Sequence, residues 1–302
     1  MQLSRVFGRF VLISLAGLAV TLAGFAAAQA NAAEQITVGN RVLLRDGKVW
    51  VPKGITVVGL LGAPASNTHK PRPAYTVAWR RWGPAEIEAA LRFGADTIRL
   101  QVSQPALDKE SGHSDRSYLA KVRAAVRLIR AAHMNVILSM QWEVTTGVDK
   151  QVNVPTDATV LAPVSSTVRA WRTLAPPFLS DRGVIFELFN EPCVKVYPAD
   201  AWQRWQAGYQ PVIDALRKMG ATNVLLIDGI QCGKVLADAP RLYDPDHALA
   251  YATHPYPMPE GVRASRVDMF TARDFERNFG QFQKEGHAVI ATEWNVWKSN
   301  CH

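Results

Sequence analysis

The feature that most constrains the fold is a repeated alternation of short apolar segments with longer amphipathic ones. The short segments are rich in branched and aromatic residues, as is typical of strands buried in a parallel sheet. The longer segments carry apolar residues on one face, as helices do. The predicted strands span residues 55–60, 97–101, 136–140, 184–189, 224–228, 249–253 and 288–292, and the predicted helices span 84–93, 115–132, 164–174, 199–219 and 270–282.

Strands that alternate with helices of this length predict right-handed βαβ units and one parallel sheet. Of the 302 residues, about 270 remain after the N-terminal segment described below, which is within the usual range for one α/β barrel. We therefore predict a single catalytic domain, residues 33–302, with the fold of a TIM-type (β/α)8 barrel. A tight turn at Asp46 and Gly47 predicts a β-hairpin within residues 36–51, a lid or plug outside the repeat.

Only seven strands can be assigned before the chain ends. Nine residues follow Glu293, too few for a helix, an eighth strand and a closing helix. An arc of seven strands would leave unpaired edges, which soluble proteins normally avoid. We therefore expect the last strand and helices of the barrel to be missing from this chain, or another segment to fill the gap.

The N-terminal residues predict a secretory signal peptide. Arg5 and Arg9 precede an uncharged apolar run over residues 10–28, and the small residues that follow offer cleavage after Ala30 or Ala32. We assign residues 1–32 to this peptide, with an uncleaved membrane anchor as the alternative because the run is rather long. Either interpretation sends the folded part across a membrane, and cleavage would leave a secreted or periplasmic protein.

Charge and cysteine content narrow the possible functions. The net charge of +8 falls to +6 without Arg5 and Arg9, and the other basic residues are scattered. Nucleic-acid binding is therefore the weaker interpretation, while an acidic polysaccharide stays possible as a substrate. The three cysteines, Cys193, Cys232 and Cys301, lack the spacing of metal ligands. Cys193 and Cys232 each follow a predicted strand, so in an oxidising compartment a disulfide between them is a reasonable hypothesis.

Polar residues follow three of the predicted strands, at the end of the barrel where reactive groups normally stand. They are Asn190 and Glu191 after the fourth strand, His254 and Tyr256 after the sixth, and Glu293 and Trp294 after the seventh.

Because side chains alternate along a strand, we expect Glu187, Phe189 and Glu191 to share one face, and Val289, Ala291 and Glu293 to share another. Both faces would point to a common cavity. Two carboxylates that face each other suit glycoside hydrolysis, in which one donates a proton and the other attacks the anomeric carbon or directs water.

The same strand ends contain three short motifs, Asn190-Glu191-Pro192, His254-Pro255-Tyr256 and Thr292-Glu293-Trp294, and the second predicted strand contains a fourth, Ile98-Arg99-Leu100. In their order along the chain they resemble the cellulase family of glycoside hydrolases, family 5 of a large retaining clan of eightfold barrels. The resemblance implies an endoglucanase- or mannanase-like glycosidase that cleaves β-linked polysaccharides or oligosaccharides with retention. We expect it to need no cofactor or metal and to act as a monomer.

The resemblance also implies roles for individual residues. Glu191 would be the acid/base and Glu293 the nucleophile. Asn190 would bind the sugar 2-hydroxyl. Arg99 would hold the nucleophile ionised, and Tyr256 would donate a hydrogen bond to it.

Other residues are candidates for binding the substrate. His254 would line the same subsite. Gln141 stands where the family usually has a histidine, which puts the identity of the substrate in doubt. The family's eighth strand brings a tryptophan floor for the sugar, and Trp294 or Trp297 could replace it. Further tryptophans that could stack on sugar faces are Trp79, Trp82 and Trp142.

Several alternatives stay open at this point. Arg99 could simply pair with a buried Glu187, and Trp202 and Trp205 are expected to pack in the core. Glu143, Asp149 and Asp228 are interpreted as rim or capping residues. A metal-dependent hydrolase that uses His254 ranks low because no paired histidines have ligand spacing. A sugar-binding barrel without turnover is the other alternative, favoured by the missing C-terminal part.

Overall fold

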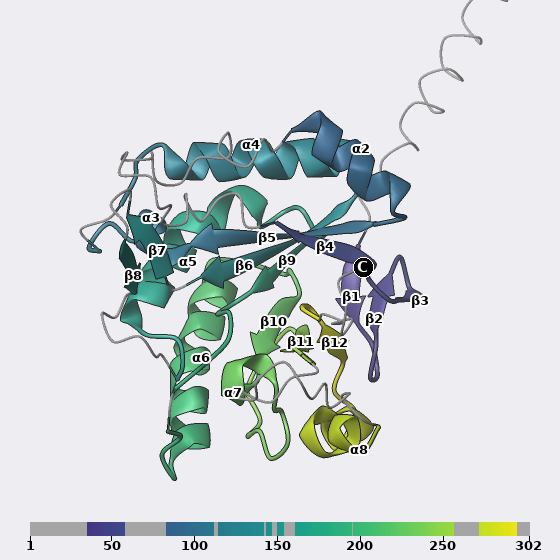
Figure 1. Ribbon diagram of the computed structural model, residues 1–302, viewed down its shortest axis with the longest axis vertical. Coiled ribbons are helices and arrows are strands. Elements are labelled where there is room, and N and C mark those ends of the chain that lie inside the picture. Colours follow the sequence, from purple (N-terminus) through teal and green to yellow (C-terminus); the bar gives the residue numbers. More distant parts are fainter. Residues whose placement is uncertain are drawn as a thin grey trace, which may run out of the picture. The chain divides into compact units, whose positions relative to one another are not determined.

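Seven parallel strands form one sheet in the order β12-β11-β10-β9-β6-β5-β4 (Figure 1). The computed structural model describes residues 35–57, 83–111, 114–141, 161–194, 196–256 and 272–294, and the main chain of 143–146 and 150–153. The strands are β4 (Gly54–Val57), β5 (Thr97–Ser103), β6 (Asn135–Gln141), β9 (Val184–Glu187), β10 (Leu225–Asp228), β11 (Leu249–Thr253) and β12 (Val289–Ala291). Each strand pairs with its neighbours along the barrel repeat, which confirms the predicted fold class.

Some predictions concern residues outside this description. They are the signal peptide at residues 1–32, and Trp79, Trp82, Trp142, Asp149, Trp297 and Cys301.

Strands β4 and β12 form the two edges of the sheet. Each pairs with a single neighbour, and the described residues contain no eighth strand. The sheet is therefore an arc of seven strands, as the strand count predicts.

The predicted hairpin is a three-stranded antiparallel sheet, β1 (Ile36–Val38), β2 (Leu43–Arg45) and β3 (Lys48–Trp50). Its buried side chains Ile36, Leu43 and Trp50 belong to an inner core with residues of the barrel strands, among them Ile185 and Leu226. The N–H of Ile36 bonds to the carbonyl oxygen of Arg182, just before β9. The hairpin is thus a plug at the amino ends of the strands, and the opposite end stays available for a site.

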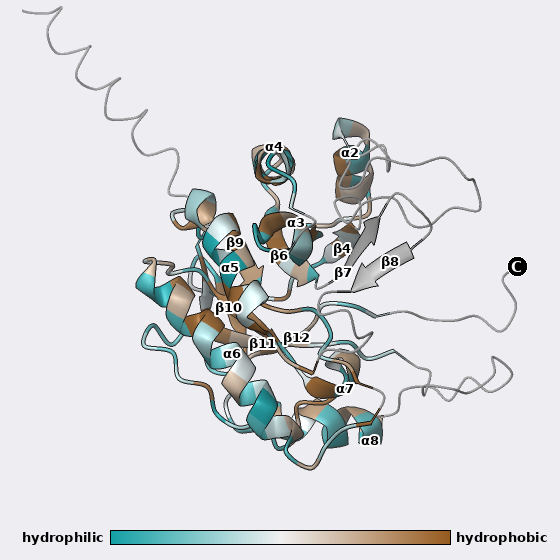
Figure 2. Ribbon diagram, turned by 90° about the vertical axis from the view of Figure 1, so that its left-hand side faces the viewer, coloured by the Kyte–Doolittle hydropathy of each residue, from teal (hydrophilic) through white to brown (hydrophobic). Residues whose placement is uncertain are grey.

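Helices cover the outer face of the sheet and form a second, larger core with it. Figure 2 shows the contrast between the apolar strands and the largely polar surfaces of α5 and α6. The main helices are α2 (Pro84–Arg92), α4 (Tyr118–Ala131), α5 (Ser165–Leu174) and α6 (Ala201–Lys218). The last helical segment consists of α8 (Ala272–Phe275), the π-helical turn η3 (Glu276–Gly280) and α9 (Gln281–Lys284). No described helix has the length and apolar character needed to cross a membrane.

The structure corrects several predicted boundaries. β9 ends at Glu187, two residues before the predicted end, while β5 and β6 run on to Ser103 and Gln141. The helix predicted from Asp115 begins at Tyr118, because Asp115 instead accepts hydrogen bonds from the main chain and hydroxyl of Ser117.

Four short elements were not predicted at all. The helices α3 (Gln104–Leu107) and α7 (Ile230–Gly233) follow strand ends directly, and the 3-10 turn η2 (Pro176–Phe178) follows α5. The loop after β6 contains a hairpin, β7 (Glu143–Thr146) and β8 (Lys150–Asn153). All four are too short for periodicity to identify them.

Three aromatic side chains on the outer helices hold the main chain where β9 and β10 end. The indole N–H of Trp171 bonds to the carbonyl oxygen of Leu188 at 2.9 Å, and that of Trp205 bonds to Asp228 O at 2.8 Å. The hydroxyl of Tyr209 bonds to Phe189 O at 3.1 Å. All three side chains are fully buried, so packing confirms the core role predicted for Trp205.

Replacing Trp205 by Phe should destabilise the fold while leaving an aromatic ring in place. The buried carbonyl of Asp228 would lose its donor, which costs about 1–3 kcal/mol of unfolding free energy. Equilibrium urea unfolding measures this. Trp202→Phe on the same helix is the control, because the indole of Trp202 is only partly buried, and a change below about 1 kcal/mol is expected. Equal losses in the two variants would contradict the role given to the indole hydrogen bond.

Candidate active site

A buried arginine gathers the polar groups at the carboxyl end of the sheet. Arg99, on β5, is 2% exposed. Its guanidinium bonds to both oxygens of Glu187, at 2.6 and 3.0 Å, and to Glu293 Oε1 at 2.5 Å. It also donates to Ser139 Oγ at 2.9 Å and to Asn190 Oδ1 at 2.6 Å. Arg99 therefore pairs with Glu187 and also contacts Glu293, while a role beside the nucleophile stays a prediction.

The bond between Arg99 and Glu293 also measures how strongly the sheet curls. In the sheet order, five strand spacings separate β5 from β12. A flat sheet would place these strands about 24 Å apart, yet the two side chains are in hydrogen-bond contact. The arc is therefore curled enough for a side chain of β5 to reach the residue that follows the edge strand β12, without an eighth strand among the described residues.

The environment of Glu293 favours its ionised form. The hydroxyl of Tyr256 donates to Oε2 at 2.6 Å, and Gln101 Nε2 donates to Oε1 at 3.3 Å. Burial by itself would raise the pKa of Glu293. Electrostatic attraction from Arg99 and His254, together with the hydrogen bond from Tyr256, outweighs the effect of burial and lowers this pKa. The pKa of Tyr256 is raised by burial and by its bond to Glu293, so the phenol keeps its proton and acts as a donor.

Glu191 lies in a different environment, at the open side of the site. Its side chain is 32% exposed, and Oε1 contacts His254 Nδ1 at 2.8 Å. His254 is fully buried, and its Nε2 contacts Thr292 Oγ1 at 2.9 Å. One oxygen of Glu191 and one of Glu293 lie within 4.8 Å of each other. Two carboxylates at this separation, one largely buried and the other partly open to solvent, can act on the two sides of one bond.

Glu191 reaches the site through a turn and not through strand alternation. β9 ends at Glu187, and Phe189 packs in the outer core between sheet and helices. The predicted common face of Glu187, Phe189 and Glu191 is therefore wrong. Glu191 has a φ of 51°, and this left-handed residue redirects the chain so that its side chain meets His254.

The alternation predicted for the seventh strand is wrong in the same way. Val289 packs against the outer core and Ile290 against the inner core. Val289, Ala291 and Glu293 would then point away from the barrel interior if the strand continued. Instead β12 ends at Ala291, and a bend at residues 292–293 turns Glu293 inward.

Asp228 is a site residue that the sequence interpretation placed at the rim. It is fully buried at the end of β10, and its Oδ2 accepts the main-chain N–H of Glu191 at 2.9 Å. Burial and the negative charge of Glu187 raise the pKa of Asp228 well above its usual range. Burial opposes ionisation of Glu187 too, but Arg99 outweighs it and lowers the pKa of Glu187. The sequence signal that could have identified Asp228 as a site residue is its position at the end of an apolar strand.

Among the side chains that the structure describes, the other predicted binding and rim residues form no direct hydrogen bond with Arg99, Glu191 or Glu293. Gln141 is buried at the end of β6 and donates to Ser139 Oγ at 3.1 Å, so it reaches Arg99 only through Ser139. Trp294 follows Glu293 and is 69% exposed. Glu143, interpreted as a rim residue, lies in β7, where only the main chain is described.

Within the part of the chain that the structure describes, two groups of side chains have ligand atoms close enough to share a metal ion. They are Glu187, Asp228 and His254, and Glu191, His254 and Glu293, each within 4.8 Å. Both groups contain a carboxylate that is already paired with the guanidinium of Arg99. A cation would have to displace or oppose that positive charge, so the geometry favours organic acid/base chemistry over metal binding.

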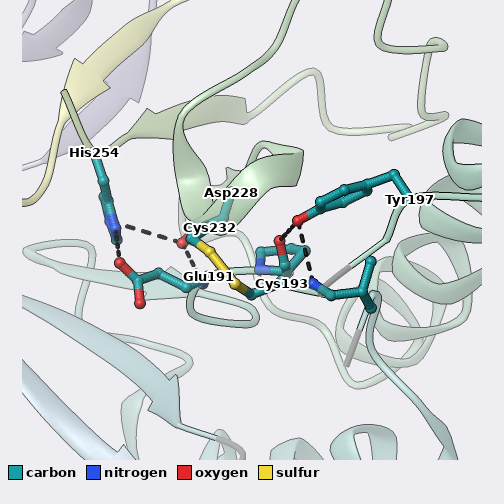
Figure 3. Close-up of a disulfide and its surroundings, with 8 residues drawn as sticks. Glu191, Cys193, Tyr197, Asp228, Cys232 and His254 are labelled. Atoms are coloured by element: carbon teal, nitrogen blue, oxygen red, sulfur yellow. Dashed lines mark hydrogen bonds and ion pairs between the residues drawn. A yellow bond between two sulfur atoms is a disulfide. The ribbon is translucent and has the colours of Figure 1, made fainter. Parts of the chain in front are cut away.

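A disulfide joins Cys193 and Cys232, as the positions of the two cysteines suggest, with their Cα atoms 4.6 Å apart. Figure 3 shows it beside Glu191, Asp228 and His254. The bond links the turn after β9 to α7, which follows β10. Closing a loop of 39 residues stabilises a fold by about 4 kcal/mol in the chain-entropy model.

Comparisons with known proteins agree with this geometry. The model of the cellulase family, glycosyl hydrolase family 5, matches residues 67–301. A β-glucanase from Saccharophagus degradans has a similar structure, with 21% identity, a TM-score of 0.63, and coverage of 90% of this chain and 76% of the other. The catalytic domain of a mannanase from Streptomyces sp. SirexAA-E has 17% identity, a TM-score of 0.61, and coverage of 88% and 73%.

An endoglucanase from Pseudomonas stutzeri is similar at 17% identity, with a TM-score of 0.59 and coverage of 81% of this chain and 76% of the other. No curated protein sequence matches significantly. At these identities the structural matches show a shared fold, while the family model covers most of the chain. The chain therefore belongs to glycosyl hydrolase family 5, the cellulase family, and is a glycosidase.

Proposed function

We propose that the protein hydrolyses β-linked polysaccharides or oligosaccharides with retention of configuration, with Glu191 as acid/base and Glu293 as nucleophile. The observation that carries this proposal is the pair of carboxylates within 4.8 Å of each other in contrasting environments. Retaining glycosidases have carboxyl groups about 5 Å apart, whereas inverting ones leave room for a water molecule between them. Similar folds include a β-glucanase crystallised with cellotetraose and a mannanase, so glucans and mannans are the first substrates to try.

The reaction would proceed in two displacements. In the first, Glu293 attacks the anomeric carbon while Glu191 gives its proton to the leaving glycosidic oxygen, which forms a glycosyl ester and releases the first product. In the second, Glu191 takes a proton from water, and the water oxygen attacks the same carbon and breaks the ester. The proton is then back on Glu191, Glu293 is an ionised carboxylate again, and two inversions give net retention.

The neighbouring residues prepare Glu293 for this role. Arg99 and Tyr256 bond to different oxygens of its carboxylate, so they fix its orientation as well as its charge. An ionised nucleophile beside a carboxyl group that can hold a proton is the arrangement that the chemistry requires.

Substrate contacts would come from the groups around this pair. Asn190 uses Oδ1 to accept from Arg99, which leaves its amide nitrogen to donate to a sugar hydroxyl. His254 and Tyr256 would line the same subsite, and exposed Trp294 would offer an aromatic face to a sugar ring. Trp142, which lies outside the described residues, is proposed for the same role. Gln141 would act further from the reacting bond.

The catalytic assignment is tested on the purified chain with aryl β-glycosides, β-glucans and mannans. We expect hydrolysis of at least one of these, and proton NMR should show the β-anomer of the product first. Glu293→Ala should lower kcat/KM at least about 100-fold on every substrate, because the nucleophile is lost. Glu191→Gln should do the same on β-glucans and mannans, because their leaving groups need a proton from the general acid.

Glu88→Gln is the matched control, because this glutamate is exposed on α2. Activity that survives both active-site substitutions rejects the assignment, and an α-anomer formed first rejects retention. Loss of activity with a chelator would instead favour the metal-dependent alternative, and sugar binding without turnover would favour a binding barrel.

Replacing Tyr256 by Phe should change the pH dependence. The hydrogen bond from Tyr256 helps to lower the pKa of Glu293, so removing it raises that pKa. Because attack requires ionised Glu293, the acidic limb of the profile of kcat/KM against pH should move to higher pH, with a loss at the optimum of roughly tenfold. Tyr243→Phe, at an exposed tyrosine, should leave the profile unchanged, and an acidic limb that stays in place in Tyr256→Phe would contradict this prediction.

We also propose that the protein is exported, after removal of residues 1–32 as a signal peptide. The charged, apolar and small-residue regions of that segment support this, and so does a disulfide, which persists in oxidising compartments. Intact mass spectrometry without reductant should find a chain that begins at Asn31 or Ala33, with no free thiol at Cys193 or Cys232. A full-length mass, or two free thiols there, would contradict the proposal.

A further inference from the structure

The main chain at Glu191 has an uncommon conformation that needs support. Its φ of 51° lies in the left-handed region, which costs a residue other than glycine about 1–2 kcal/mol. This conformation aims the Glu191 side chain at His254, so its maintenance decides where the carboxyl group stands. The contacts that stabilise this turn therefore decide the position of the carboxyl group of Glu191, the proposed acid/base.

The loop after β10 holds the turn at three points (Figure 3). Asp228 Oδ2 accepts the main-chain N–H of Glu191 at 2.9 Å, and the N–H of Cys232 donates to Pro192 O at 2.9 Å. The third point is the disulfide between Cys193 and Cys232. Of the three contacts, only the bond from Asp228 reaches Glu191 itself.

Asp228 is itself held firmly. It is fully buried, and its main-chain carbonyl accepts the indole N–H of Trp205 at 2.8 Å. The next residue, Gly229, has no room for a side chain, since a Cβ there would lie 2.1 Å from Val235 O. His254 Nε2 lies 3.8 Å from Asp228 Oδ2. His254 and Asp228 therefore lie side by side. His254 contacts the side chain of Glu191, and Asp228 accepts a hydrogen bond from its main chain.

We propose that Asp228 is a positioning residue, whose hydrogen bond to the main chain of Glu191 keeps the carboxyl group of Glu191 on His254 and opposite Glu293. This inference rests on the proposed role of Glu191 as acid/base. Asp228 does not touch the substrate in this scheme. Its effect on catalysis passes entirely through the placement of Glu191.

Asp228 needs no charge for this task. Burial and the nearby negative charge of Glu187 raise its pKa, which favours the uncharged form of the carboxyl group. A protonated carboxyl group keeps an acceptor oxygen for the N–H of Glu191. Asparagine has nearly the same shape and also offers one acceptor oxygen, so it can replace Asp228, whereas alanine and valine cannot.

The experiment uses substrates that differ only in the leaving group, one with a poor phenol and one with an activated dinitrophenol. A poor leaving group needs the proton from Glu191, while an activated one departs almost without it. In Asp228→Ala we expect kcat/KM to fall at least about tenfold for the phenyl glycoside and less than about threefold for the dinitrophenyl glycoside. Asp228→Asn should stay within about threefold of wild type for both.

Glu191→Ala is measured in parallel, so that two kinds of failure can be told apart. In Glu191→Ala we expect kcat/KM to fall much more for the phenyl glycoside than for the dinitrophenyl glycoside, and this difference should be larger than in Asp228→Ala. If Glu191→Ala shows this difference and the Asp228 variants do not, the positioning role is overturned and the function of Glu191 stands. If Glu191→Ala shows no such difference, the acid/base assignment fails and this inference fails with it.

A merely structural role for Asp228 gives a different result. It predicts equal losses for both leaving groups in Asp228→Ala, and this outcome overturns the proposal. If Asp228→Ala does not fold, as judged by circular dichroism, Asp228→Val fills more of the buried space without an acceptor and is compared with Asp228→Asn by the same ratio. A ratio in the valine variant equal to that of the asparagine variant also overturns the proposal.

Discussion

The site depends on one buried positive charge, the guanidinium of Arg99. Removing a guanidinium from water is costly unless it is paired and fully hydrogen-bonded. Here Glu187, Glu293, Ser139 and Asn190 satisfy it. Ser139 lies on β6, Glu187 and Asn190 at the end of β9 and just after it, and Glu293 after β12. The same contacts that make Arg99 tolerable in the interior also hold Glu293 ionised, so the requirements of folding and of chemistry coincide.

The barrel separates an apolar half from a charged half. At the amino ends of the strands, the hairpin side chains Leu43 and Trp50 close the inner core. At the carboxyl ends, the buried groups are ionised or polar, and the chain turns sharply just beyond the strands. Glu191 and Glu293 lie on these turns and not on the strands, where a small change of main chain re-aims a side chain without disturbing the sheet.

The seven strands that the structure describes bring the two carboxylates together, because the sheet curls until the side chain of Arg99 on β5 reaches Glu293 after β12. The turn that carries Glu191 has its own support. A disulfide, a main-chain hydrogen bond and Asp228 tie it to the loop after β10, and Trp205 on α6 ties that loop to the outer helices. The placement of one exposed carboxyl group thus depends on contacts that extend to the far side of the sheet.

The sequence by itself determined the order of the barrel strands and main helices, the hairpin before them, the strand ends that carry polar groups and the disulfide partners. Hydrophobic periodicity and the glycine and proline residues that end elements are local properties of a sequence. It did not determine how Glu191 and Glu293 face the cavity, since alternation stops where a strand stops and the left-handed turn at Glu191 has no local signature. It indicated a rim or capping residue at Asp228, but not that its side chain is buried beside Glu187 and His254. Only the tertiary structure decided these points, because the burial of a carboxyl group, the partners of Arg99 and the curl of the sheet all arise from contacts between residues far apart in the chain.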